Sequence, residues 1–450
     1  MKIAHSQSTE SDPNEDLRQL RKSTLSGTIG TALEYYDFVL YGLAAAFVFN
    51  KLFFPETDPA VGLLASFATY AVGFLARPIG GIVLGALGDR LGRKSVLVIT
   101  VLLMGLSSFG IGLLPTYETI GLAAPLLLVL LRIMQGFGAG AELASASTLM
   151  VESAPRRRRG LVGSLVCIGT NTGTLVASGI WLLVSLLPDD QLFSWGWRAP
   201  FLVSILVAAW GLWMRRDLSE GHAFHEVADR QKALSFKTVY RDLVRNGWRA
   251  FLLCFGMRLG EAGTSILYQV FLVGYLSTML GVDRSTGTLA LVLASVYAYL
   301  SIPLLGHLSD RYGRRIVFRA LSGFQLVFAV PGIMMIQSGR PVLIILAFVL
   351  AFGTAVLGMY AVESSYMPEM FGSRYRLAGL TAAKEIGGLL GGGIAPMIAA
   401  ALTAATGSLW PIGCYIALLA GVAFVCAIAA PETKGRDLVS EHDAGREARA

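Results

Sequence analysis

Two loops with one charged motif decide the fold of this 450-residue chain: Gly88-Asp89-Arg90-Leu91-Gly92-Arg93-Lys94 and Ser309-Asp310-Arg311-Tyr312-Gly313-Arg314-Arg315. The second copy follows the first after 221 positions, close to half the chain. Glu142 and Glu363 are separated by the same interval. Repeats of this kind are typical of secondary transporters, whose substrate site lies between the repeats near mid-membrane.

The composition indicates a membrane protein. The chain is 54% hydrophobic and 15% charged, against roughly 25% charged residues in soluble domains. Ser95 to Leu114 carries no charge, and a spanning helix needs about 20 apolar residues. We expect an all-α protein of twelve transmembrane helices in two pseudo-symmetric six-helix bundles. The predicted helices are 26–49, 60–86, 95–114, 121–148, 161–186, 199–214, 249–276, 287–306, 316–336, 341–367, 376–402 and 408–429.

The loop charges predict the orientation. Loops on the side shared by both termini hold 28 Lys and Arg residues, against 4 in the opposite loops. By the positive-inside rule both termini are cytosolic, so the net charge of +7 reflects topology rather than nucleic-acid binding. The predicted parts are an N-terminal tail (1–25), a first bundle (26–214), a cytosolic linker (215–248), a second bundle (249–430) and a C-terminal tail (431–450).

Several kinds of chemistry are not predicted. The charged loops are not phosphate-binding loops, because Arg93 stands where that motif needs its second glycine. The four cysteines and five histidines form no metal-ligand pattern, so no metal, cofactor or enzymatic activity is expected. The polar, acidic N-terminus does not fit a signal peptide.

The repeated loops are interpreted as a cytosolic gate. A glycine permits a tight turn, and the neighbouring charges can pair with helix ends of the other half, holding one conformation. The alternative is that these charges only fix the topology. The gating residues proposed on this basis are Asp89, Arg90, Arg93, Asp310, Arg311, Arg314, Glu142 and Glu363.

Charges inside apolar helices indicate the functional site. Glu34 and Asp37 lie three residues apart on one helix, and two close carboxylates in an apolar medium favour proton uptake. They are the predicted proton-coupling pair, and an ion pair with Arg77 at similar depth is the alternative. Arg132 has only Gln135 nearby and is predicted to hold a substrate carboxylate, or else to form an interhelical salt bridge.

The second half supplies the remaining candidates. Arg258 and Glu261, at i and i+3, can satisfy each other, and Arg258 occupies the place in the second half that Asp37 occupies in the first. Tyr268 is a candidate cavity residue, although tyrosine is also a membrane-interface anchor. Lys384 and Glu385 point about 100° apart, so they cannot both face one spot. Lys384 is assigned to substrate binding and Glu385, with Arg77 and Glu261, to supporting ion pairs.

The chain resembles the major facilitator superfamily, and within it the metabolite:proton symporter family. The resemblance covers nearly the whole chain and rests on the two charged loops and on five further stretches: Ala32 to Phe38, Ala76 to Gly81, Arg132 to Gly136, Trp197 to Phe201 and Glu432 to Asp437. It implies proton-driven uptake of small polar metabolites across the bacterial inner membrane.

Two departures bear on the substrate. The short tail lacks the coiled coil typical of osmosensing proline and betaine carriers, and Lys384-Glu385 stands where the family commonly has an aromatic residue and Gln. We expect a monomeric symporter of protons with a small organic acid. A symporter of a zwitterion such as proline or betaine and, more distantly, a non-transporting receptor are the alternatives.

Overall fold

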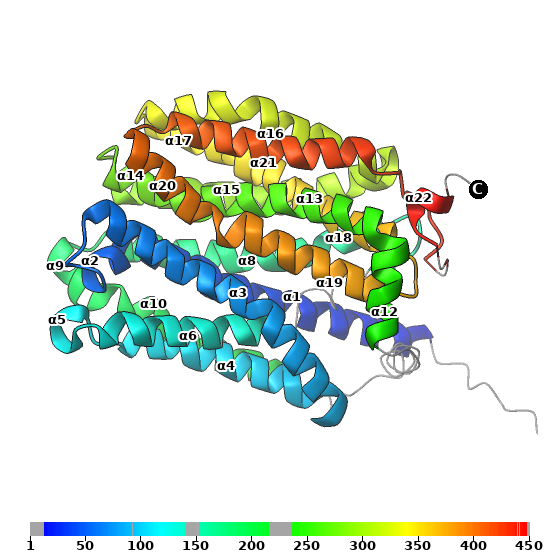
Figure 1. Ribbon diagram of the computed structural model, residues 1–450, viewed down its shortest axis with the longest axis horizontal. Helices are drawn as coiled ribbons and strands as arrows, with labels where there is room; N and C mark the ends of the chain where they lie inside the picture. Colours follow the sequence, from blue (N-terminus) through cyan, green and yellow to red (C-terminus); the bar gives the residue numbers. More distant parts are fainter. Residues whose placement is uncertain are drawn as a thin grey trace, which may run out of the picture.

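The helices of the computed structural model run side by side along one long axis (Figure 1). The structure describes residues 13–91, 93–140, 151, 154–215, 236–438, 440 and 442–447, in which all regular elements are helical. Within these residues ten helices are long and apolar enough to cross a membrane. Two shorter apolar helices, Val98–Leu113 and Ala123–Ala139, occupy the third and fourth predicted positions. The predicted all-helical membrane fold is thereby confirmed.

Within the described residues, these ten long helices and two shorter ones are divided six to each half, and some contain π-helical turns that are labelled η. The first half contains α1 (Pro13–Ala44), η1 (Ala45–Phe49), α2 (Asn50–Leu52), α3 (Pro59–Leu91), α4 (Arg93–Leu113), α5 (Tyr117–Ile120), α6 (Ala123–Ala139), α8 (Arg159–Ser185), α9 (Asp189–Gln191), η2 (Leu192–Gly196) and α10 (Arg198–Arg215). The second contains α13 (Trp248–Ile266), η4 (Leu267–Phe271), α14 (Leu272–Thr278), α15 (Arg284–Tyr312), α16 (Arg314–Gln337), α17 (Pro341–Phe348), η5 (Val349–Val356), α18 (Leu357–Met370), α19 (Arg376–Gly387), η6 (Gly388–Gly393), α20 (Ala395–Thr406) and α21 (Trp410–Ala429).

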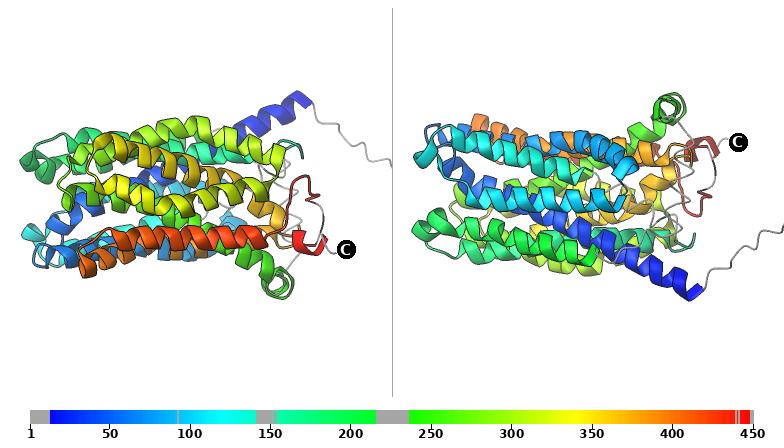
Figure 2. Two further views of the ribbon diagram at one scale, coloured as in Figure 1. Left: turned by 90° about the horizontal axis from the view of Figure 1, so that it is seen from above. Right: turned by 90° about the horizontal axis from the view of Figure 1, so that it is seen from below.

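One end of the bundle carries the start of α1 and the C-terminal segment, and we call it the terminal face (Figures 1 and 2). In the sequence, α12 (Phe236–Asp242) and η3 (Leu243–Gly247) connect the first half to the second. They lie at the terminal face, where α12 runs across the bundle (Figure 1). The helix α1 begins at Pro13, earlier than the predicted start of the first spanning helix at residue 26. The short helix α22 (Ala444–Glu447) ends the described chain.

The two halves meet along several helix pairs. On one side of the bundle α8 packs against α15 and α18, and on another α3 packs against η6 and α20. Near the end opposite the terminal face, η1 contacts α14. These contacts bring residues far apart in sequence around one central space.

Candidate functional site

A small cavity lies between the halves. Charged side chains of α3, α13 and α19 line it together with aromatic rings of α1 and α3, and these residues are Arg77, Arg258, Glu261, Lys384, Glu385, Tyr35, Phe38 and Phe74. Lys384 and Glu385 both reach this cavity, so the expectation that they cannot face one spot is wrong. The cavity has a volume of ≈ 40 Å³. One water needs roughly 10–15 Å³ of such a volume, so the cavity has room for a few waters. Binding of a substrate therefore requires the two halves to rearrange.

Arg77 joins the two halves at this cavity. Its guanidinium pairs with Glu34 of α1 in its own half. On its other side Arg77 Nε lies 3.3 Å from Glu385 Oε2 of α19 in the second half. Of the two acids that the sequence offered as an ion-pair partner of Arg77, Glu34 makes the contact and Asp37 does not, and Glu385 is the second acid that contacts Arg77. The Arg77–Glu385 contact must break when the halves separate here.

Arg258 forms a matching centre in the second half. It pairs with Glu261 on the same helix, which confirms the predicted i, i+3 contact. Arg258 Nη1 also lies 3.7 Å from Glu363 Oε2 of α18. The prediction that Glu363 belongs to the cytosolic gate is wrong, because its side chain faces this interior cluster. Each central arginine thus stands between two glutamates.

The ionised groups around the cavity do not balance. The cations are Arg77, Arg258 and Lys384, and the acids are Glu34, Glu261, Glu363 and Glu385, so the fully ionised set carries one net negative charge. All seven side chains are buried or nearly so. An uncompensated charge in an apolar interior is costly, so this set favours uptake of a proton or binding of a cationic group.

Arg132 and Asp37 lie deeper inside the first half. Arg132 is fully buried, donates a hydrogen bond to Gln135, and stacks on Phe38, Tyr41 and Tyr70 at 4.4, 4.1 and 4.9 Å from the ring centroids. Asp37 accepts a hydrogen bond of 3.4 Å from Ser204. Neither residue lines the cavity, so the structure does not bring Arg132 to the place expected of a substrate ligand.

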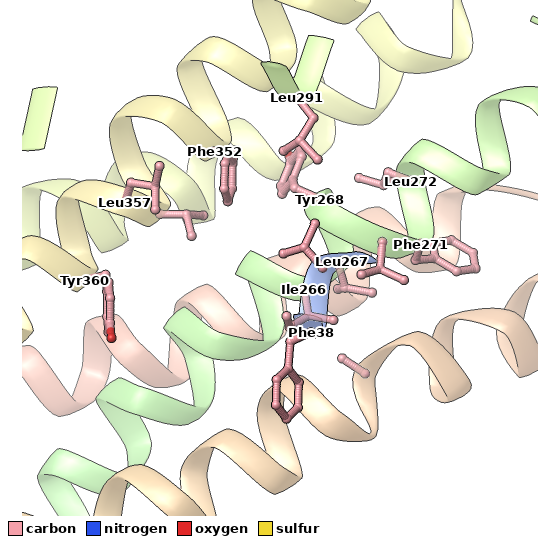
Figure 3. Close-up of a cluster of buried hydrophobic side chains, with 14 of the residues drawn as sticks. Phe38, Ile266, Leu267, Tyr268, Phe271, Leu272, Leu291, Phe352, Leu357 and Tyr360 are labelled. Carbon is pink, nitrogen blue, oxygen red and sulfur yellow. The ribbon is translucent and has the colours of Figure 1, made fainter. Parts of the chain in front are cut away.

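Phe38 separates Arg132 from the cavity. Its ring also receives the Arg77 guanidinium, 5.0 Å from its centroid, so two arginines contact one aromatic side chain. Phe38 lies close to Ile266 of the second half, where the cavity wall is apolar (Figure 3). The structure therefore links the Asp37 region to the cavity through an aromatic contact.

Tyr268 does not reach the cavity either. It points toward Leu291 and Phe352 and away from Phe38 (Figure 3). Its ring packs edge-on against Phe348, with centroids 5.5 Å apart, inside the second half. This position corresponds to a core residue, neither the cavity ligand nor the interface anchor that the sequence suggested.

The second charged loop closes the terminal face. The Asp310 carboxylate accepts backbone N–H bonds of 2.8 Å from both Gly160 and Leu161, at the start of α8 in the other half. Arg314 donates a 2.8 Å hydrogen bond to Asp310 and lies 3.3 Å from Glu369. The expected pairing of this loop with a helix end of the other half is confirmed.

The turn itself requires glycine. Gly313 has φ of +107°, which L side chains rarely adopt, and a Cβ there would lie 2.4 Å from Glu432 Oε2. Arg311 is exposed and places its guanidinium 5.4 Å from the Tyr312 ring centroid. The side chains of Asp89, Arg90 and Arg93 and the whole of Glu142 lie outside the described part of the chain.

The role of the C-terminal segment was not predicted from the sequence. Glu432 accepts backbone N–H bonds of 2.8 and 3.1 Å from Arg314 and Arg315 and so caps α16. The Arg436 guanidinium donates a hydrogen bond to the backbone carbonyl of Glu369. The backbone carbonyl of Arg436 accepts a 2.7 Å hydrogen bond from the guanidinium of Arg159 in the first half. The only available signal was the charged Glu432 to Asp437 stretch, which was interpreted as part of a tail.

The helical bundle with two repeated halves and a charged cavity between them defines a membrane transporter rather than an enzyme. Comparison with known proteins agrees: residues 24–224 match the model of the Sugar (and other) transporter family and residues 262–449 that of the Major Facilitator Superfamily. The chain belongs to the major facilitator superfamily and is a multi-pass membrane transporter.

Its relatives are bacterial transporters. The chain is 40% identical to an Escherichia coli K12 protein named only as a transporter, YdfJ, covering 91% of this chain and 96% of that one. It is 37% identical to the shikimate transporter (86% and 88%) and 33% identical to the proline/betaine transporter (93% and 85%) of the same strain. The crystal structure of a D-xylose-proton symporter has the same fold, with a TM-score of 0.71 at 18% identity over 93% and 99% of the chains.

Proposed function

We propose that this protein is a proton-coupled symporter that imports a small organic acid by alternating access. It would act as a monomer in a bacterial inner membrane with both termini, and hence the terminal face, in the cytosol. The observation that carries the proposal is the convergence of Arg77, Arg258 and Lys384 on one small cavity between the halves. Guanidinium groups suit carboxylates because they offer paired N–H donors.

The Arg77–Glu385 contact supplies a mechanism for coupling substrate to movement. It ties α3 to α19 across the cavity, with 3.3 Å between the charged atoms. A substrate carboxylate competes with Glu385 for Arg77 and is held by Arg258 and Lys384 from the second half. When the Arg77–Glu385 ion pair breaks, the halves can separate on one side, and the substrate carboxylate neutralises Arg77. A ligand shifts such an equilibrium only through contacts that differ between states.

Protons complete the charge balance. The ionised cavity is already net negative, so a further anion is disfavoured unless a carboxylate is protonated. Glu34 is the first candidate because its protonation frees Arg77. Asp37 is the second, since it lies with Arg132 behind Phe38 and senses the same rearrangement. In this scheme Arg132 is a positioning residue, and Tyr268 supports the wall of the second bundle.

Relatives support transport of a carboxylate or of a zwitterion. A shikimate transporter carries an acid, which agrees with three cavity cations. A proline/betaine transporter carries zwitterions, and one feature of the cavity favours that alternative: Glu261 and Glu385 beside the rings of Tyr35, Phe38 and Phe74 could hold a quaternary ammonium. A receptor without transport activity has no comparable support.

The test is uptake into proteoliposomes containing the purified full-length protein. External pH is recorded while shikimate, other mono- and dicarboxylates, betaine, proline and xylose are added in turn. We expect external alkalinisation with a carboxylate, lost in Arg77→Gln and Glu34→Gln and retained in Glu118→Gln, an exposed control. Alkalinisation with betaine alone would favour the zwitterion, and substrate flux without proton movement would refute symport.

A further inference from the structure

The second half contains a pair of acids that share one guanidinium nitrogen. Arg258 Nη1 contacts Glu261 Oε2 and lies 3.7 Å from Glu363 Oε2. The longer distance exceeds that of a hydrogen bond. Neither Glu363 carboxylate oxygen has a hydrogen-bond partner among the described residues, and the side chain is 0% exposed. Glu363 is therefore the least compensated acid near the cavity.

The surroundings contain only limited positive charge. The ammonium group of Lys384 in α19 attracts both Glu261 and Glu363 electrostatically. Arg77 of α3 lines the same cavity. The other titratable groups that face the cluster are neutral in their ordinary forms: Tyr35 of α1, Cys167 of α8 and Tyr360 of α18. Tyr360 packs its ring 5.0 Å from the Arg258 guanidinium carbon and donates no hydrogen bond to Glu363 within the described structure.

Two carboxylates that converge on one cation in an apolar interior resist joint ionisation. Lys384 is shared with Glu385, and Arg77 is occupied by Glu34 and Glu385. Within the described structure Glu363 accepts the fewest hydrogen bonds of these acids, so its negative charge is the least stabilised. A proton on one oxygen of this pair removes that charge and can serve either glutamate.

We propose that Glu261 and Glu363 hold one shared proton and form a second proton-coupling site, in the C-terminal half. The inference rests on the proposed function and adds a site to it. The proton comes from water in the cavity, binds one carboxylate oxygen and leaves Arg258 less engaged. Arg258 is then available to a substrate carboxylate, and by reciprocity a bound substrate favours the protonated pair. Departure of the substrate returns Arg258 to the acids and releases the proton to water.

The test does not depend on knowing the substrate. Infrared difference spectra of the substrate-free, full-length protein in lipid are recorded between acidic and alkaline pH, and the carbonyl band of protonated carboxylic acids is compared among variants. We expect Glu261→Gln and Glu363→Gln each to lose the same one-proton share of this band. The double variant should lose no more than either single variant. Glu118→Gln, a change at an exposed acid, should leave the band intact.

Other outcomes overturn the inference. Loss of the band in Glu363→Gln alone means an isolated protonated acid, and a double-size loss in the double variant means two independent protons. No loss in either single variant means that both acids are ionised. If the variants do not fold, wild-type protein is treated with a carbodiimide that modifies protonated carboxyl groups in apolar sites. Peptide mass mapping should then find one adduct per molecule, on Glu261 or on Glu363, and absence of both adducts contradicts the pair.

These outcomes are separate from those for transport. Failure of every substrate to move protons refutes the proposed function even if the band behaves as expected. Conversely, symport that persists with an unchanged band in both single variants leaves the function standing and removes this second site.

Discussion

Asp310→Asn is expected to open the terminal face of the transporter. The Asp310 side chain is 6% exposed and accepts three hydrogen bonds of 2.8 Å, two from the backbone at the start of α8 and one from Arg314. Hydrogen bonds to charged groups contribute about 1.5–3 kcal/mol, and an anion at a helix N-terminus up to about 2 kcal/mol. Asparagine keeps one acceptor oxygen, so we expect a loss of about 2–3 kcal/mol, which is roughly 30- to 150-fold in the ratio of closed to open forms.

A native cysteine reports the opening. Cys167 of α8 is buried against α18 of the other half, with Sγ 3.7 Å from the Leu357 carbonyl oxygen. In protein whose other three cysteines are replaced by alanine, Asp310→Asn should accelerate maleimide labelling of Cys167 by up to that factor. Asp190→Asn, an exposed acid at the opposite end, is the matched control. Equal labelling rates in Asp310→Asn and in the parent would refute the role of this contact in closure.

Three further predictions concern the contacts between helices. Gly306→Ala should also accelerate Cys167 labelling, because its Cβ would lie 2.6 Å from Ser164 Oγ and force α8 and α15 apart; unchanged labelling would contradict this. Arg284→Gln removes an exposed ion pair with Asp189, which is worth at most about 1 kcal/mol. Initial transport rates should therefore change less than about fivefold. A larger loss would indicate a gate at the end opposite the terminal face. Glu432→Ala removes the cap of α16, worth about 0.5–2 kcal/mol, and should lower the thermal unfolding midpoint in detergent; an unchanged midpoint would show that the cap is dispensable.

The fold was predictable from the sequence because the membrane imposes strong rules. Backbone polar groups must be satisfied within helices in lipid, so apolar stretches of sufficient length report spanning helices directly. The repeat of the Asp89 and Asp310 loops then indicated two equivalent halves. Helix ends were less predictable: α1 extends back to Pro13 although its first residues are polar, since a helix that continues beyond the apolar stretch leaves no apolar signal.

The candidate site was predictable as a set of residue types but not as a set of partners. Arg258 and Glu261 were paired correctly because their contact is local along one helix. Glu363 was misplaced because its symmetry with Glu142 suggested a shared gating role, whereas its neighbour is Arg258 on another helix. The Arg77–Glu385 contact crosses between halves, and sequence spacing carries no information about such a pairing.

Arg132 shows the limit of reasoning from unpaired charges. No acid stands near it in sequence, which suggested a substrate ligand. In the structure three aromatic rings contact its guanidinium, and cation–π contacts of this kind leave no sequence pattern. The C-terminal segment was missed for a similar reason, because short polar stretches that bind helix ends by backbone hydrogen bonds resemble solvated tails.

The central claim is that the net negative cavity couples an anion to protons, and proton uptake on binding tests it most directly. Titration calorimetry of the full-length protein with the carboxylate identified by transport, repeated in buffers of different ionisation enthalpy, gives the number of protons taken up per bound substrate. We predict uptake of at least one proton near neutral pH, reduced in Glu34→Gln. Binding of the anion with no proton uptake would contradict the account and show that the cavity cations alone neutralise the substrate.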